Sequence, residues 1–157
     1  MAKSSSGFIF QPKLVYDRNS PSNDEDKEAN LSTTTVPSLS FESRFECGNL
    51  HRVIQTGATE YDLLVSCDYN TARHRQWFYF RIENMRRNTE YRFNIVNYDK
   101  PGSIYNKGCK PTMFSSKRFE QTGIGWTRAN TSDTLYYNNA YKNDYSPKFT
   151  ELKTITV

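Results

Sequence analysis

The chain has 157 residues, the length of a single domain, and is too short to form two sizeable hydrophobic cores. Aromatic residues make up 15% of the sequence whereas the mean hydropathy of -0.82 is low, which is typical of a β-protein with an aromatic core and very polar loops. The net charge of +4 permits an acidic partner without requiring one, and no apolar run approaches the roughly 20 residues that cross a bilayer, so we expect no membrane partner.

Residues 1–38 are rich in Ser, Thr, Asn, Asp and Glu. Because residues 19–35 have almost no large apolar side chains, they cannot offset their own ordering entropy, and we expect a flexible polar lead-in. One apolar island, at residues 7–16, is expected to dock as an edge strand. The folded domain is predicted to cover residues 39–157.

Strand patterns begin at residue 39. Residues 41–47 alternate with period two, which places Phe41, Phe45 and Cys47 on one buried face. Further strands are predicted at residues 50–54, 61–67, 76–82, 91–95, 134–137 and 149–157. The spacing of these runs, with polar turns between them, indicates an all-β fold built as an antiparallel β-sandwich or barrel.

The densest aromatic run is Trp-Phe-Tyr-Phe at residues 77–80. In a strand, Trp77 and Tyr79 point to one face while Phe78 and Phe80 point to the other. A soluble monomer cannot leave such a large apolar surface in water. Both faces are therefore expected to be covered by a second sheet, another domain or a partner.

Three cysteines, Cys47, Cys67 and Cys109, are odd in number and widely spaced, which argues against a disulfide framework or a zinc site. Because no signal peptide precedes them, we expect free thiols in a reducing compartment. His51 and His74 are followed three residues later by Ile and Trp, so neither starts a His-x-x-Glu metal pair. No dinucleotide, phosphate-loop or hydrolase-elbow motif is present either, so the sequence indicates neither a catalytic residue nor a metal ligand.

Two arginine pairs, Arg73 with Arg75 and Arg86 with Arg87, lie in predicted connections between strands. Basic residues near aromatic ones occur on RNA-binding faces, but the small net charge and the missing glycines of the RNA-recognition signature argue against nucleic acid as a partner. The four arginines then either form a solvated face or contact an acidic partner.

Several stretches, in the right order, resemble the N-terminal domain of the cytosolic carboxypeptidases, zinc enzymes that trim glutamates from tubulin tails and other acidic C-termini. The resemblance runs from about residue 39 to residue 141, and Cys47 stands where the family usually has Ser. The matching stretches are FESRFECGNL (41–50), EYDLL (60–64), DYNT (68–71), QWFYF (76–80), YRFNIVN (91–97), KP (100–101) and KPTMFS (110–115).

The resemblance implies an antiparallel β-sandwich that packs in cis against a zinc peptidase domain and helps shape the mouth of its active site. Trp77 and Tyr79 become candidate anchors of that domain interface. Arg73, Arg75, Arg86 and Arg87 become candidate contacts for acidic glutamylated tails such as those of tubulin. The resemblance also implies a cytoplasmic location.

The family's zinc ligands, substrate-binding arginines and general-base Glu have no counterpart in this chain. We therefore expect it to be inactive alone and to need no cofactor of its own, with zinc held by the missing catalytic domain. The family's sandwich continues beyond the point that matches Val157, so one or two final strands are expected to be absent. The alternative is a stand-alone protein-binding module that uses the exposed aromatic face without any peptidase.

Overall fold

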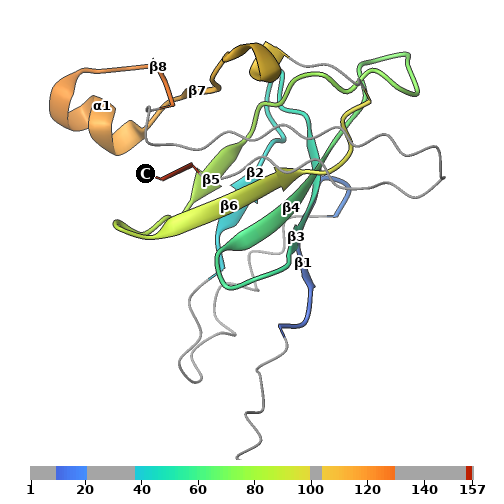
Figure 1. Cartoon of the computed structure of the whole chain (residues 1–157), viewed down its shortest axis with the longest axis horizontal. Helices are drawn as coiled ribbons and strands as arrows, with labels where there is room; N and C mark the ends of the chain where they lie inside the picture. The colour runs from blue at the N-terminus through green and yellow to red at the C-terminus, as the bar shows by residue number, and fades with distance from the viewer. Residues whose placement is uncertain (1–9, 21–37, 100–103, 130–154, 157) are drawn as a thin grey trace, which may run out of the picture.

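The structure, a computed structural model, describes residues 10–20, 38–99, 104–129 and 155–156, the last pair by backbone alone. Within these ranges the chain forms short strands and one short α-helix (Figure 1). None of the helices in the described part is long and apolar enough to cross a membrane.

The larger sheet contains five strands in the order β1-β3-β4-β6-β9. Neighbouring strands are antiparallel except β4 and β6, which are parallel. Parallel neighbours need a crossover connection, and here the chain leaves the sheet after Val65 and passes through a second, two-stranded layer before it returns as β6. The strands of the sheet are β1 (Lys13–Asp17), β3 (Leu50–Gln55), β4 (Glu60–Val65), β6 (Glu90–Ile95) and β9 (Ile155–Thr156).

The second layer is the antiparallel pair β2 (Ser40–Glu42) and β5 (Arg81–Glu83). Its Phe41 ring lies 5.3 Å from the ring of Tyr61 in β4 and 6.3 Å from that of Phe93 in β6. Because β4 and β6 alternate with period two, the apolar residues on one face of each strand reach this space and are buried there: Tyr61, Leu63, Val65, Tyr91, Phe93 and Ile95. The predicted all-β sandwich with an aromatic core is confirmed.

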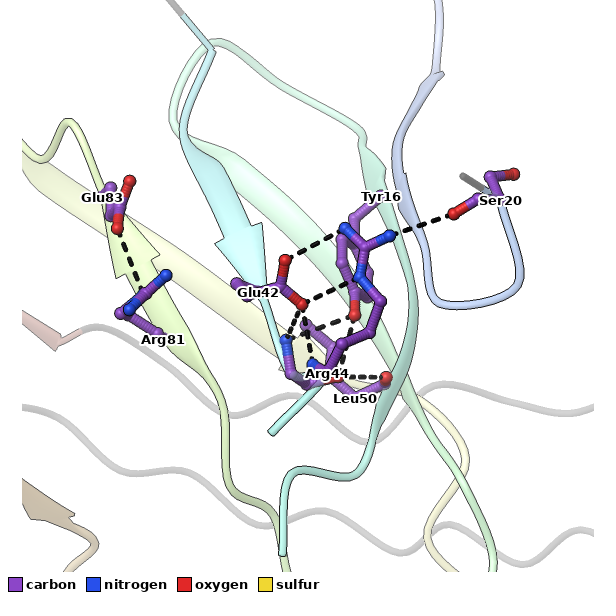
Figure 2. A network of polar contacts seen from close by, with 8 residues as sticks. Tyr16, Ser20, Glu42, Arg44, Leu50, Arg81 and Glu83 are labelled. Atoms are coloured by element: carbon purple, nitrogen blue, oxygen red, sulfur yellow. Dashed lines mark hydrogen bonds and ion pairs between the residues drawn. The ribbon is translucent and has the colours of Figure 1, made fainter. Parts of the chain in front are cut away.

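A buried polar network joins β1 to the loop after β2 and to β3 (Figure 2). The fully buried Ser43 donates its hydroxyl proton to the Leu50 carbonyl oxygen at 2.6 Å, so the Tyr16 hydroxyl, 2.9 Å away, donates to Ser43 Oγ. The Tyr16 oxygen in turn accepts the Ser43 N–H at 3.2 Å. Every polar group of the two side chains is therefore satisfied away from water, which a buried hydroxyl requires.

The predicted strand at residues 41–47 is wrong beyond Glu42. The Glu42 carboxylate accepts the backbone N–H groups of Ser43 and Arg44 at 2.8 and 2.7 Å, which turns the chain out of the strand. Cys47 then adopts a left-handed φ of 61° and is exposed, so it does not share a buried face with Phe41. Ser43, assigned to no face by the sequence pattern, is the buried residue instead.

The predicted strand at residues 76–82 is shorter than expected, because only Arg81–Glu83 pairs with another strand. Residues 76–80 are nevertheless extended beside Asn49, whose side chain takes the place of a neighbouring strand. Asn49 Nδ2 donates to the Trp77 carbonyl oxygen at 2.8 Å, and Asn49 Oδ1 accepts the Tyr79 N–H at 2.8 Å. The predicted alternation of faces survives, since Phe78 and Phe80 pack against the core and Trp77 and Tyr79 do not.

The segment after β6 contains a 3-10 turn, η2 (Ile104–Lys107), and a pair of two-residue strands, β7 (Thr112–Met113) and β8 (Thr127–Arg128). Between these strands lies helix α1 (Ser116–Thr122), which the sequence analysis did not predict. The predicted strand at 134–137 lies outside the described residues, as do residues 7–9 of the predicted edge strand. Of the predicted strand at 149–157, the structure describes only Ile155–Thr156, which form β9.

Candidate interaction surface

Five aromatic rings form one continuous row, here called the aromatic ladder. In order along the row they are Phe45, Tyr79, Trp126, Phe114 and Phe119, with successive ring centroids 5.1, 6.0, 5.7 and 5.5 Å apart. The rings are tilted or edge-on to one another, the arrangements that aromatic pairs prefer. Three segments far apart in the sequence thus contribute to one surface.

Most of the ladder faces solvent. The exposed fractions are 37% for Tyr79, 45% for Phe114, 48% for Phe119 and 58% for Trp126. Scattered single apolar residues on a surface need no explanation, but contiguous exposed rings mark an interaction site. Trp and Tyr are also the residue types that most often dominate binding energy at protein interfaces.

Local structure holds each part of the ladder in place. Tyr79 is held by its hydrogen bonds to Asn49. Phe119 lies on α1, which begins at Ser115, where Oγ accepts the Arg118 N–H at 3.3 Å, and ends at Gly123 in a left-handed conformation. None of the seven residues of α1, all within the described part, is buried, so the helix does not use its apolar side chain to build this domain's core.

The two interface anchors predicted from the sequence are both exposed, but they differ in their contacts. Tyr79 is a member of the ladder. Trp77, 41% exposed, donates its indole N–H to Asp68 Oδ1 at 2.8 Å, which orients the ring while leaving much of it in solvent. Trp77 thus adds exposed apolar surface on the segment that carries Tyr79, but it is not a member of the ladder.

Sequence reasoning missed four members of the ladder: Phe45, which was predicted on a buried strand face, and Phe114, Phe119 and Trp126. A helix signal was available, since Ser115 and Gly123 have the spacing of an N-cap and a C-cap around a short helix. No local signal places Phe114 next to Trp126, however. That contact depends on the pairing of β7 with β8, in which Met113 lies opposite Thr127.

The four arginines predicted to contact acidic tails do not form one site. Arg75 is paired with Asp99, with its Nη1 3.0 Å from the carboxylate, so its charge is compensated within the domain. Asp99 follows β6, whereas Arg86 and Arg87 precede it, and a six-residue strand is about 20 Å long at 3.3 Å per residue. The two arginine pairs therefore belong to opposite ends of β6. Arg73, Arg86 and Arg87 are exposed.

In the described part, a metal or catalytic site would require titratable side chains that lie close together. Among the described residues, no three His, Cys, Asp or Glu side chains lie close enough together to hold a metal ion. The cysteines Cys47, Cys67 and Cys109 are free thiols, as predicted. On the sheet, Asn94 Nδ2 donates to both Asp62 at 2.9 Å and Glu60 at 3.0 Å, and burial together with the Glu60 charge raises the pKa of Asp62. This cluster bridges β4 and β6 and has a structural role.

Comparison with known proteins identifies the family. The family model for the cytosolic carboxypeptidase N-terminal domain matches residues 41–153. Cytosolic carboxypeptidase 2 of Danio rerio is 47% identical over 103 residues, which cover 66% of this chain and 14% of the relative. Cytosolic carboxypeptidase 4 of Mus musculus is 46% identical over 104 residues, covering 66% of this chain and 9% of the relative.

The chain matches only about a seventh or less of the length of these relatives. No solved structure matches the chain at a significant level. The family match covers well over half of the chain and agrees with the β-sandwich seen in the structure. This chain therefore belongs to the cytosolic carboxypeptidase family, in which it corresponds to the N-terminal domain.

Proposed function

We propose that this domain is the accessory unit of a carboxypeptidase and packs, through its aromatic ladder, against the catalytic part of the same polypeptide. The observation that carries the proposal is the exposure of four contiguous ladder rings outside the buried core that the described residues form. Burying a large apolar side chain contributes about 1.5–3 kcal/mol, so covering these rings would stabilise an assembled enzyme substantially.

The chemistry of the whole enzyme is part of the proposal. We infer that it removes C-terminal or side-chain glutamates from acidic protein tails such as those of tubulin, in the cytoplasm, with zinc held in the catalytic part. The resemblance to the carboxypeptidase family and the names of the relatives support this. We infer that the domain itself contributes no hydrolytic group. Its exposed Arg73, Arg86 and Arg87 would attract acidic tails electrostatically, an effect that weakens as salt rises.

A stand-alone binding module is the less favoured reading, because the relatives continue far beyond the matched region. The two readings differ in the partner that the aromatic ladder contacts. In an accessory domain, loss of the ladder should impair the enzyme to which the domain is attached. In a free-standing module it should impair only the binding of a separate partner.

The test is a chimaera in which this chain's matched segment replaces the corresponding 103 residues of the Danio rerio relative. Glutamate release from a peptide ending in several glutamates is measured for the chimaera and for its Tyr79→Ser/Trp126→Ser variant. We expect the variant to lose at least about tenfold in activity or soluble yield, the size of effect seen when interface hot spots are truncated. Tyr69→Ser, which removes an aromatic side chain 92% exposed and outside the ladder, is the matched control. Equal activity of all three proteins would contradict the proposal.

A further inference from the structure

Residues 104–129, here called the basic lobe, carry a net charge as large as that of the whole chain. The segment holds five basic residues and one acidic residue, Glu120, so its net charge is +4, and the net charge of all 157 residues is also +4. The remainder of the chain is therefore balanced. The basic residues of the lobe are Lys107, Lys110, Lys117, Arg118 and Arg128.

The two guanidinium groups of the lobe are held by neutral oxygens. Arg118 Nη1 donates to Thr127 Oγ1 at 3.3 Å, and Arg128 Nη1 donates to the Lys110 carbonyl oxygen at 3.2 Å. Arg52 and Arg75, which lie outside the lobe, instead pair with carboxylates, Arg52 with Asp17 at 2.8 Å and Arg75 with Asp99 at 3.0 Å. The charges of Arg118 and Arg128 are thus fixed in position without being neutralised by these contacts.

The same lobe contributes the most exposed part of the aromatic ladder. Phe114 and Trp126 lie next to the pair β7–β8, and Phe119 lies on α1 beside Lys117 and Arg118. The hydrogen bond from Arg118 to Thr127 spans from the helix to β8. The lobe therefore combines contiguous apolar rings with cations on the elements that carry those rings. Figure 1 shows β7, α1 and β8 together at one side of the domain, away from the middle of the larger sheet.

We propose that the basic lobe docks onto a protein surface of complementary design, with an apolar centre bordered by carboxylates, in the carboxypeptidase part of the polypeptide. This rests on the proposed function and adds the chemistry of the partner surface. Opposite charges bordering an apolar contact increase the rate of association and disfavour wrong partners. Like-charged or uncharged surfaces would leave the fixed guanidinium groups of Arg118 and Arg128 without a counter-charge.

A protein partner fits the lobe better than an anionic membrane. Helices that lie in a membrane interface are usually long and strongly amphipathic, whereas α1 has seven residues. The rings also contact each other in a row, with Phe114 between Phe119 and Trp126, which forms a shaped surface for a complementary protein. The relatives provide a partner in cis, because the matched region is only 14% of the Danio rerio protein.

The test measures binding in trans. The full chain is immobilised, and the probe is the Danio rerio relative from which the matched 103 residues have been deleted. We expect binding that weakens at least about tenfold between 50 and 300 mM salt, since this change greatly shortens the distance over which exposed charges act. Lys117→Glu/Arg118→Glu should reduce the affinity at least about tenfold, as expected for reversed charges at an interface rim and centre.

The matched control is Lys13→Glu/Arg81→Glu, which makes the same change in net charge at exposed positions outside the lobe and should leave the affinity within about twofold. Because α1 buries none of its described residues, the charge variants of the lobe are expected to fold, and near-ultraviolet circular dichroism checks this. Phe114→Ser is a second variant that should weaken binding through lost apolar contact.

The outcomes separate the two proposals. Absence of binding by the unaltered chain contradicts the accessory role and the docking proposal together. Binding that weakens with Phe114→Ser but is insensitive to salt and to Lys117→Glu/Arg118→Glu contradicts the docking proposal alone, because the ladder then associates without carboxylates around it. A third arm uses vesicles containing about a third phosphatidylserine, a surface on which each nearby cation contributes about 1 kcal/mol. Vesicle binding that requires Lys117 and Arg118, without binding to the probe, would overturn the protein partner in favour of a lipid surface.

Discussion

Asn49 holds both backbone polar groups of Tyr79 by hydrogen bonds. The side-chain oxygen Oδ1 of Asn49 accepts the Tyr79 N–H at 2.8 Å, and the backbone N–H of Asn49 donates to the Tyr79 carbonyl oxygen at 3.1 Å. The backbone and side chain of one buried residue thus supply the hydrogen bonds that a neighbouring strand would otherwise make to the aromatic segment. It also determines that the Tyr79 ring reaches the aromatic ladder.

Asn49→Ala should destabilise the domain and loosen the aromatic segment. The substitution removes the partners of the Tyr79 N–H and of the Trp77 carbonyl group. Leaving such groups without partners costs about 1–3 kcal/mol each when they are buried, and less where water reaches them. We expect the free energy of unfolding to fall by about 2 kcal/mol in a urea titration. Asn19→Ala, at an exposed position, is the control and should change stability by less than about 0.5 kcal/mol.

Two glycines should respond to alanine for different reasons. A Cβ atom at Gly48 would overlap the backbone carbonyl of Ser43, so Gly48→Ala must displace the loop that positions Ser43. Gly123 has open space around it but a φ of 69°, so Gly123→Ala strains only its own backbone. We expect the free energy of unfolding, measured by thermal unfolding, to fall by about 1 kcal/mol in Gly123→Ala and by at least twice that in Gly48→Ala. Equal losses would contradict the close approach at Gly48.

Tyr16 and Ser43 should show strong energetic coupling. Tyr16→Phe removes the hydroxyl that donates to Ser43 Oγ and accepts the Ser43 N–H, which keeps the Glu42 carboxylate as its other acceptor. Ser43→Ala removes the acceptor of the Tyr16 hydroxyl proton and a donor to the Leu50 carbonyl oxygen. Each single change is expected to cost about 1–3 kcal/mol, because the groups are buried. The double variant should cost less than the sum, by at least about 0.5 kcal/mol. Additive losses would mean that the two hydroxyls act independently.

Glu42 should make the domain sensitive to acid. The Arg44 side chain, followed by the Arg44 and Ser43 backbone N–H groups, lowers the pKa of Glu42 from 4.5 to about 2. A carboxyl whose pKa is depressed on folding stabilises the protein above its unfolded pKa, and that contribution disappears as the pH falls from about 4.5 to about 2. Because the pair is partly exposed, we expect a contribution of about 1 kcal/mol rather than the full value of the shift.

The measurement is the free energy of unfolding at pH 6 and at pH 2.5 for the unaltered chain and for Glu42→Gln. Glu42→Gln should be less stable than the unaltered chain at pH 6, and its free energy of unfolding should fall by less between pH 6 and pH 2.5. Glu83→Gln is the control, since the Arg81–Glu83 ion pair is more exposed than Arg44–Glu42. An unchanged acid response in Glu42→Gln would contradict the role assigned to this carboxylate.

The sequence by itself determined the fold class, the family and the main core residues. In β4 and β6 large apolar residues recur at every second position, so Tyr61 and Leu63, like Phe93 and Ile95, share a face of their strand. The alternation of residues 77–80 also survived without a regular strand, because any extended backbone places successive side chains on opposite sides.

Tertiary structure alone decided where strands end, which strands pair and which rings meet. The turn after Glu42 depends on where its carboxylate points, and the parallel pairing of β4 with β6 depends on a crossover through the second layer. The aromatic ladder joins residues up to 81 positions apart, from Phe45 to Trp126, through contacts that have no local sequence signal. Such contacts form only when loop-closure entropy is offset by packing of the completed domain, so no window of sequence contains them.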